Sequence, residues 1–203
     1  MMSTERIYIY KRYERFWHWS QAALIITMML TGFEVHGSYT LFGFKLAVRV
    51  HTFSAWALLV LWAFTIFWQF TTGEWRQYLP TLKNVSAMVN YYAFGIFRNA
   101  PHPFRKTVVQ KHNPLQRLAY LALLAFISPL IWVSGLLYLF YADWATLGIA
   151  SYLSLEFVAV AHTAAAFLMT AFAFGHVYLT TTGHTLFAHI KAMITGWEEV
   201  EKH

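Results

Sequence analysis

Four histidines lie inside stretches of the sequence that carry no Asp, Glu, Lys or Arg. They are His18, His51, His162 and His176. An ionisable side chain in hydrocarbon needs a partner, and such a residue is a functional residue by default. Neutral imidazole is a common ligand of metals and of haem iron. Ligation of a metal or a haem is therefore the first chemistry that these residues suggest.

The spacing of His162 and His176 strengthens this interpretation. They are 14 residues apart. At about 100° per residue both would project from nearly one face of a helix, and at about 1.5 Å per residue they would lie roughly 21 Å apart. Two centres separated in this way would span most of the hydrocarbon core of a bilayer.

The elements that must position these histidines are transmembrane helices. Hydrophobic residues make up 58% of the 203 residues and charged residues only 12%, against about 25% charged in soluble domains. The charge-free stretches run over 16–33, 50–73, 118–142 and 157–190, and a spanning helix needs about 20 apolar residues. The predicted fold class is all-α, an integral membrane four-helix bundle formed by a single domain, 1–203. Its helices are expected at about 16–36, 49–72, 115–141 and 156–182.

Basic residues predict the orientation of this bundle. Of the 15 Lys and Arg residues, only Lys45 and Arg49 lie between the first and second helices, and all others lie on the opposite side. The positive-inside rule then places both termini and the long second loop in the cytoplasm. An apolar piece of that loop, 88–97, is expected to form an interfacial amphipathic helix.

Depth divides the four histidines into two pairs. His51 and His162 lie near the outer ends of their helices, whereas His18 and His176 lie toward the cytoplasmic ends. Two imidazoles from facing helices can ligate one six-coordinate haem iron. We therefore predict two haem b groups, an outer one on His51 and His162 and an inner one on His18 and His176.

A haem also needs small residues around the macrocycle and cations near its propionates. Gly32 and Gly135 could make room for the outer haem, and Ala166 lies on the histidine-bearing face of the fourth helix. Arg15 could pair with propionates of the inner haem, and Arg49 could do so on the outer side. These five residues complete the predicted haem sites.

Other function classes fit the composition less well. The chain has no Cys, which excludes disulfides, cysteine nucleophiles and an iron–sulfur cluster held by its own thiolates. The basic residues that give the net charge of +6 lie in the segments between apolar runs. The orientation of a membrane protein explains this distribution, so no nucleic-acid partner is expected. The alternative function is a membrane transporter for a metal or a small molecule with His in its path, although such sites usually include carboxylates. A third option is a self-contained superoxide:quinone-type oxidoreductase.

Several motifs make the chain similar to a known family. The motifs are RFWHW at 15–19, His51, KHNPLQR at 111–117, HTAAA at 162–166, GHVY at 175–178, GH at 183–184 and the tail at 190–196. The chain resembles the di-haem cytochrome b membrane subunits of formate dehydrogenases (the gamma subunit), of nickel–iron hydrogenases and of thiosulfate reductases. The resemblance extends over nearly the whole chain, and the spacing of the two histidines in the fourth helix is its most specific element.

The resemblance implies the same pairing of histidines and adds a quinone pocket beside the inner haem. Asn113 and Gln116 match the positions that contribute to this pocket in the formate dehydrogenase branch, and His112 is expected nearby. That branch has Ala-Gly where this chain has Pro114 and Leu115.

The family also implies how such a chain works. It is expected to be an electron-transfer and quinone-reactive subunit rather than a complete enzyme, located in the inner membrane of a bacterium. Its quinone would be menaquinone or ubiquinone. Its partner would be a periplasmic-side catalytic or iron–sulfur subunit, or a multihaem cytochrome c.

Overall fold

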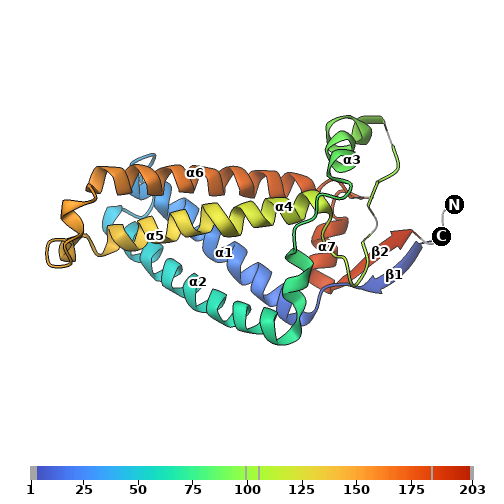
Figure 1. The fold of residues 1–203 in the computed structure, drawn as a ribbon, viewed down its shortest axis with the longest axis horizontal. Helices are drawn as coiled ribbons and strands as arrows, with labels where there is room; N and C mark the ends of the chain where they lie inside the picture. The colour runs from blue at the N-terminus through green and yellow to red at the C-terminus, as the bar shows by residue number, and fades with distance from the viewer. Residues whose placement is uncertain (1–3, 99, 105, 184, 202–203) are drawn as a thin grey trace. The chain divides into compact units, whose positions relative to one another are not determined.

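The computed structural model describes residues 4–98, 100–104, 106–183 and 185–201, and this part of the chain is mostly helical (Figure 1). Within it, three helices have the length and composition to cross a membrane. They are α2 (Phe44–Thr72), the continuous helix Pro114–Leu139 and α6 (Leu155–Thr180). α1 (Arg12–Val35) is long enough, but its first half contains charged and polar residues that lower its hydropathy.

The helix boundaries lie close to those expected from the sequence. The predicted second helix starts earlier than expected, because Gly43 adopts a positive φ of 83° and allows α2 to begin at Phe44. His184 lies outside the described residues. The chain divides into two compact units, one made of 1–79, 105–111 and 180–203, the other of 80–104 and 112–179. The prediction of a single bundle formed by the whole chain stays a prediction.

In the first unit, α1 and α2 run antiparallel and are joined by a short loop (Figure 1). The buried Glu34 carboxylate closes this loop. One of its oxygens accepts hydrogen bonds from the backbone N–H groups of Leu41, Phe42 and Gly43 at 2.8, 2.8 and 2.7 Å. Backbone donors of the loop just before α2, which would otherwise be unsatisfied, are thereby paired.

The two ends of the described chain form a small sheet in the first unit. Strand β1 (Thr4–Tyr8) pairs antiparallel with β2 (Trp197–Glu201), which follows helix α7 (Ala188–Thr195). Gly196 makes the turn between α7 and β2 at φ +89°, and a Cβ there would lie 2.5 Å from the Tyr8 ring. The all-α prediction missed this sheet, because two short strands leave little periodicity to detect.

A charged cluster ties three segments of the first unit together. Lys111, which is 2% exposed, places its Nζ 2.6 Å from Glu14 Oε1 and 3.0 Å from Glu74 Oε2. Lys11 Nζ lies 2.6 Å from the other Glu74 oxygen. Burial raises the pKa of Glu74, but hydrogen bonds and attraction from the two lysines outweigh it and hold that pKa below its usual value. The cluster fixes the residue immediately before His112.

In the second unit, helix α3 (Val85–Asn90) continues through a π-helical turn, Tyr91–Gly95, and a 3₁₀ turn, Ile96–Arg98. The helix expected at 88–97 lies within this helical run. α4 (Pro114–Ala122) and α5 (Ser128–Leu139) form one continuous helix through a π-helical turn at Leu123–Ile127. The π-helical turn lies just before Pro129, whose missing N–H interrupts the regular hydrogen-bond ladder.

Candidate haem-binding histidines

His51 is held by a hydroxyl of the neighbouring helix. Its Nδ1 lies 3.2 Å from Oγ1 of Thr31, which is fully buried in α1. Thr31 Oγ1 also donates to the carbonyl of Thr27 at 2.8 Å. A hydroxyl has one proton and a carbonyl can only accept, so Thr31 accepts a hydrogen bond from His51 Nδ1. Nδ1 therefore carries a proton in this network, and in the neutral imidazole Nε2 then carries the lone pair that a metal requires.

His162 is held in the same way in the second unit. Its Nδ1 lies 3.1 Å from Ser134 Oγ and 3.1 Å from the carbonyl oxygen of Ile131. Ser134 Oγ donates to the carbonyl of Leu130 at 2.5 Å. Both neighbours of Nδ1 are thus acceptors, so His162 also has its proton on Nδ1 and its lone pair on Nε2.

Each of these imidazoles lies against a glycine. A Cβ on Gly32 would lie 3.2 Å from Cε1 of His51, and one on Gly135 would lie 3.1 Å from Cε1 of His162. The two glycines were expected to pack against haem, and the structure shows that they make room for the imidazole rings. Their contact with a haem stays a prediction.

One local pattern is therefore common to both units. A hydroxyl residue and a glycine are adjacent in one helix, Thr31-Gly32 or Ser134-Gly135, and the next long helix supplies the imidazole that both contact. We call each such pair a hydroxyl–glycine seat. The sequence pattern predicted a role for the two glycines but none for Thr31 and Ser134, although a hydroxyl residue beside a glycine in an apolar helix is a visible signal.

His18 lies in α1, in a more aromatic environment. Its ring packs edge-to-face on Trp19, with centroids 5.1 Å apart. One turn earlier, Arg15 donates from Nη1 to the carbonyl of Ile194 at 2.6 Å, while its buried Nε has no hydrogen-bond partner among the described residues. Arg49 is exposed near the start of α2. The pairing of either arginine with propionates stays a prediction.

His176 belongs to a series of aromatic rings in the second unit. It stacks on Phe172 with centroids 6.2 Å apart and planes 5° apart. The ring centroids of Phe172 and Tyr120 lie 6.4 Å apart, and those of Tyr120 and His112 lie 5.0 Å apart. The structure thus connects His112, predicted to bind quinone, to His176 through two aromatic side chains. Ala166 lies half-buried ten residues before His176 in α6.

Asn113 and Gln116 form a capping box at the start of α4. The Asn113 side chain accepts from the Gln116 backbone N–H, and the Gln116 side chain accepts from the Asn113 backbone N–H, both at 2.9 Å. The buried Asn113 amide also donates to Tyr92 Oη at 3.3 Å. Burial raises the pKa of Tyr92, and this hydrogen bond offsets it only in part. These contacts are structural, and binding of quinone by Asn113 and Gln116 stays a prediction.

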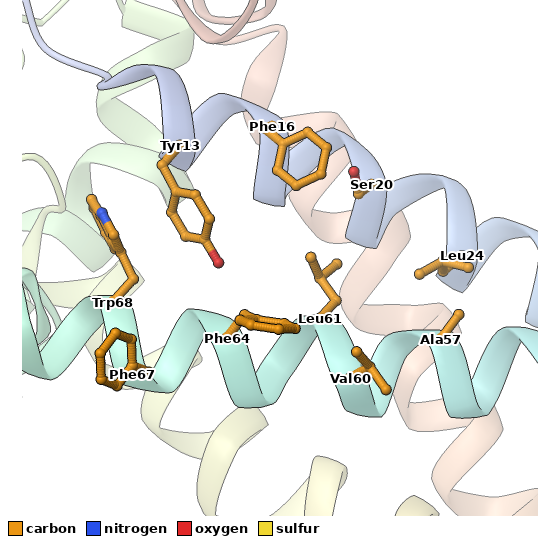
Figure 2. Close-up of a pocket in the computed structure, with 10 residues that line it drawn as sticks. All are labelled: Tyr13, Phe16, Ser20, Leu24, Ala57, Val60, Leu61, Phe64, Phe67 and Trp68. Atoms are coloured by element: carbon orange, nitrogen blue, oxygen red, sulfur yellow. The ribbon is translucent and has the colours of Figure 1, made fainter.

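An apolar groove of about 490 Å³ lies between α1 and α2 (Figure 2). Phe16, Ser20 and Leu24 line it from α1 at helical spacing. His18 is about 200° around the helix from Phe16 and from Ser20, so it belongs to another face of α1. Within the described ranges, no three His, Cys, Asp or Glu side chains gather as a metal site.

Comparison with known proteins adds independent information. The family model described as "Prokaryotic cytochrome b561" matches residues 9–196. A relative from Escherichia coli (strain K12), "Putative cytochrome YdhU", is 32% identical over 201 residues, which cover 95% of this chain and 75% of the relative. No solved structure matches the chain.

Proposed function

Because this chain belongs to the prokaryotic cytochrome b561 family, whose members are four-helix membrane cytochromes with haem b and transfer electrons, we propose a specific form of that function. The chain carries electrons across the membrane between a periplasmic-side redox partner and quinone near the cytoplasmic side. Bound haem b supplies the one-electron redox chemistry. The protein supplies the ligands, the dry surroundings and the hydrogen bonds that tune them.

The state of the two outer imidazoles is the observation that carries this proposal. His51 and His162 each have Nδ1 bound to a hydroxyl that must accept, so each offers Nε2 as a neutral ligand. A neutral imidazole whose second nitrogen is held by an acceptor is the usual form of a metal-ligating histidine. We therefore assign His51 and His162 to an outer haem.

The inner haem is assigned to His18 and His176, with quinone close to it. α1 starts at the cytoplasmic side in the predicted orientation, and His18 is early in that helix; His176 is late in α6, which runs inward. The ring series from His112 to His176 supports a quinone site at this end of the second unit. Menaquinone or ubiquinone would contact His112, Asn113 and Gln116, and protons for quinone reduction would come from the cytoplasm.

We place the chain in a bacterial inner membrane, where electron transfer between its two sides moves charge across the membrane potential. With both termini in the cytoplasm, the outer haem faces a periplasmic catalytic or iron–sulfur subunit, or a multihaem cytochrome c. One elementary charge that crosses the membrane is worth about 2.3 kcal/mol per 100 mV. The helical run Val85–Arg98 would lie at the cytoplasmic interface.

Haem analysis of single variants of the purified full-length chain tests this proposal. The parent is expected to bind two haem b groups with sharp bands on reduction, and each of His18→Ala, His51→Ala, His162→Ala and His176→Ala should retain one. His36→Ala is the matched control, because His36 is exposed at the outer end of α1, and it should retain both. A parent without haem, as expected for a transporter, would contradict the proposal, and so would variants with unchanged haem content.

A further inference from the structure

We propose that Thr31 and Ser134 are positioning residues that set the reduction potential of the outer haem. By accepting a hydrogen bond from Nδ1, each hydroxyl holds its imidazole in the tautomer that ligates through Nε2. This inference rests on the proposed assignment of His51 and His162 as the outer ligands. The hydrogen bond between Thr31 and His51 lies within the first unit, and the bond between Ser134 and His162 lies within the second. Each bond is therefore argued from one unit alone.

Each of the two hydroxyls accepts from its imidazole because its own proton is already donated to a carbonyl. Both hydroxyls belong to buried residues, with exposed fractions of 0% for Thr31 and 4% for Ser134. Each hydroxyl proton is directed to the carbonyl four residues earlier in its own helix. A helical Ser or Thr commonly makes this bond. Here it leaves the oxygen lone pairs as the groups that meet the imidazole.

The hydrogen bond at Nδ1 changes the basicity of the imidazole as a ligand. An acceptor at Nδ1–H draws the proton away from the ring and makes Nε2 a more basic ligand. A more basic ligand stabilises ferric iron over ferrous iron, so removal of the acceptor should raise the midpoint potential. The hydrogen bond is present in both oxidation states, so only the difference in its strength shifts the potential. The expected change in the ferric-to-ferrous ratio at a fixed potential is therefore below about fivefold, the full net value of one such bond; a tenfold change would be about 59 mV for one electron.

The two seats are expected to respond unequally. His162 has the carbonyl of Ile131 as a second acceptor at Nδ1, 3.1 Å away. A backbone carbonyl stays in place when a side chain is changed. Ser134→Ala should therefore raise the potential of the haem by less than Thr31→Val does, since Nδ1 of His162 can shift toward the carbonyl of Ile131.

The test is a redox titration of purified full-length variants, followed through the haem absorption bands. Thr31→Val replaces the hydroxyl with a methyl group of similar size, and Thr31→Ser restores a hydroxyl. Thr27→Val is the matched control, because Thr27 makes the same kind of intrahelical bond one turn earlier, to the carbonyl of Ala23. We expect Thr31→Val to raise the potential of one haem and to leave the other unchanged. Thr31→Ser and Thr27→Val should match the parent.

The possible outcomes separate this inference from the proposed function. Two retained haems with unshifted potentials in Thr31→Val would overturn the inference, while loss of one haem in His51→Ala would leave the proposed function intact. If Thr31→Val loses a haem, recovery of that haem in Thr31→Ser supports the role of the hydroxyl, and loss in both variants overturns it. If His51→Ala keeps both haems, the ligand assignment itself is wrong.

Discussion

The histidines proposed as ligands of the outer haem and of the inner haem have different kinds of neighbours. His51 and His162 each lie in a hydroxyl–glycine seat, where one hydrogen bond defines the tautomer. The described contacts of His18 and His176 include aromatic rings, Trp19 and Phe172. A hydrogen bond acts on ligand basicity, whereas a ring fixes orientation through packing. Substitution of Thr31 or Ser134 should therefore change the potential of a haem bound at His51 and His162, whereas substitution of Trp19 or Phe172 should change the orientation of the imidazole that it contacts.

The largest effect is expected from filling an outer seat. Gly32→Val adds a Cβ about 3 Å from His51 Cε1, together with two methyl groups, so the imidazole must leave its position. We expect loss of one haem from the purified protein, measured by haem content per chain. Gly175→Val is the matched control, since a Cβ at Gly175 meets no described atom within 4 Å. Full haem content in Gly32→Val would contradict the close contact between Gly32 and the His51 ring.

The next effect concerns the buried lysine that precedes His112. Lys111→Met leaves Glu14 and Glu74 facing an apolar side chain, and breaking a buried ion pair from one side costs about 3 kcal/mol or more. The variant should lose its inner haem band at a lower temperature than the parent does. Lys83→Met, at an exposed position, is the control and should melt like the parent. Loss of the inner haem band at the same temperature in all three proteins would show that the cluster does not stabilise the inner haem site.

The same cluster predicts a pH dependence. The folded pKa of Glu74 is below its usual value, so its contribution to stability is present above the unfolded pKa of about 4.3. That contribution is lost as the pH falls through the lower folded value. Melting temperature should therefore drop on acidification below about pH 4.3, and less so in Glu74→Gln, which starts less stable. An identical acid profile in the two proteins would contradict the role of Glu74.

A smaller effect is expected at the capping box. Asn113→Ala removes the side chain that accepts from the Gln116 N–H and donates to Tyr92, and loss of such a cap costs about 1 kcal/mol. Asn113→Asp keeps the cap but loses the donor to Tyr92. The proposed contact of Asn113 with quinone predicts that Asn113→Asp lowers the rate of quinone reduction while its melting temperature stays that of the parent. A rate equal to that of the parent would contradict this contact and leave Asn113 as a helix cap.

Much of the architecture could be predicted from the sequence, because charge-free stretches and basic loops report directly on membrane helices. The apolar pattern predicted α2, the helix Pro114–Leu139 and α6 nearly to their ends. The family resemblance, drawn from motifs such as those around His18 and His176, is confirmed by the match to the prokaryotic cytochrome b561 family.

The remaining features depend on how segments distant in sequence pack together. Thr31 and His51 are 20 residues apart, and Ser134 and His162 are 28 apart; which hydroxyl meets which imidazole depends on the rotation of packed helices. The Lys111 cluster joins residues 97 positions apart. Periodicity within one helix carries no information on either contact.

The pairing of the four histidines can be measured most directly with double variants of the purified chain. His51→Ala/His162→Ala should remove the two ligands of the same outer haem and retain one haem per chain. His51→Ala/His176→Ala should remove one ligand from each haem and retain none. Haem quantification per chain distinguishes these cases, and equal haem content in the two double variants would contradict the proposed pairing.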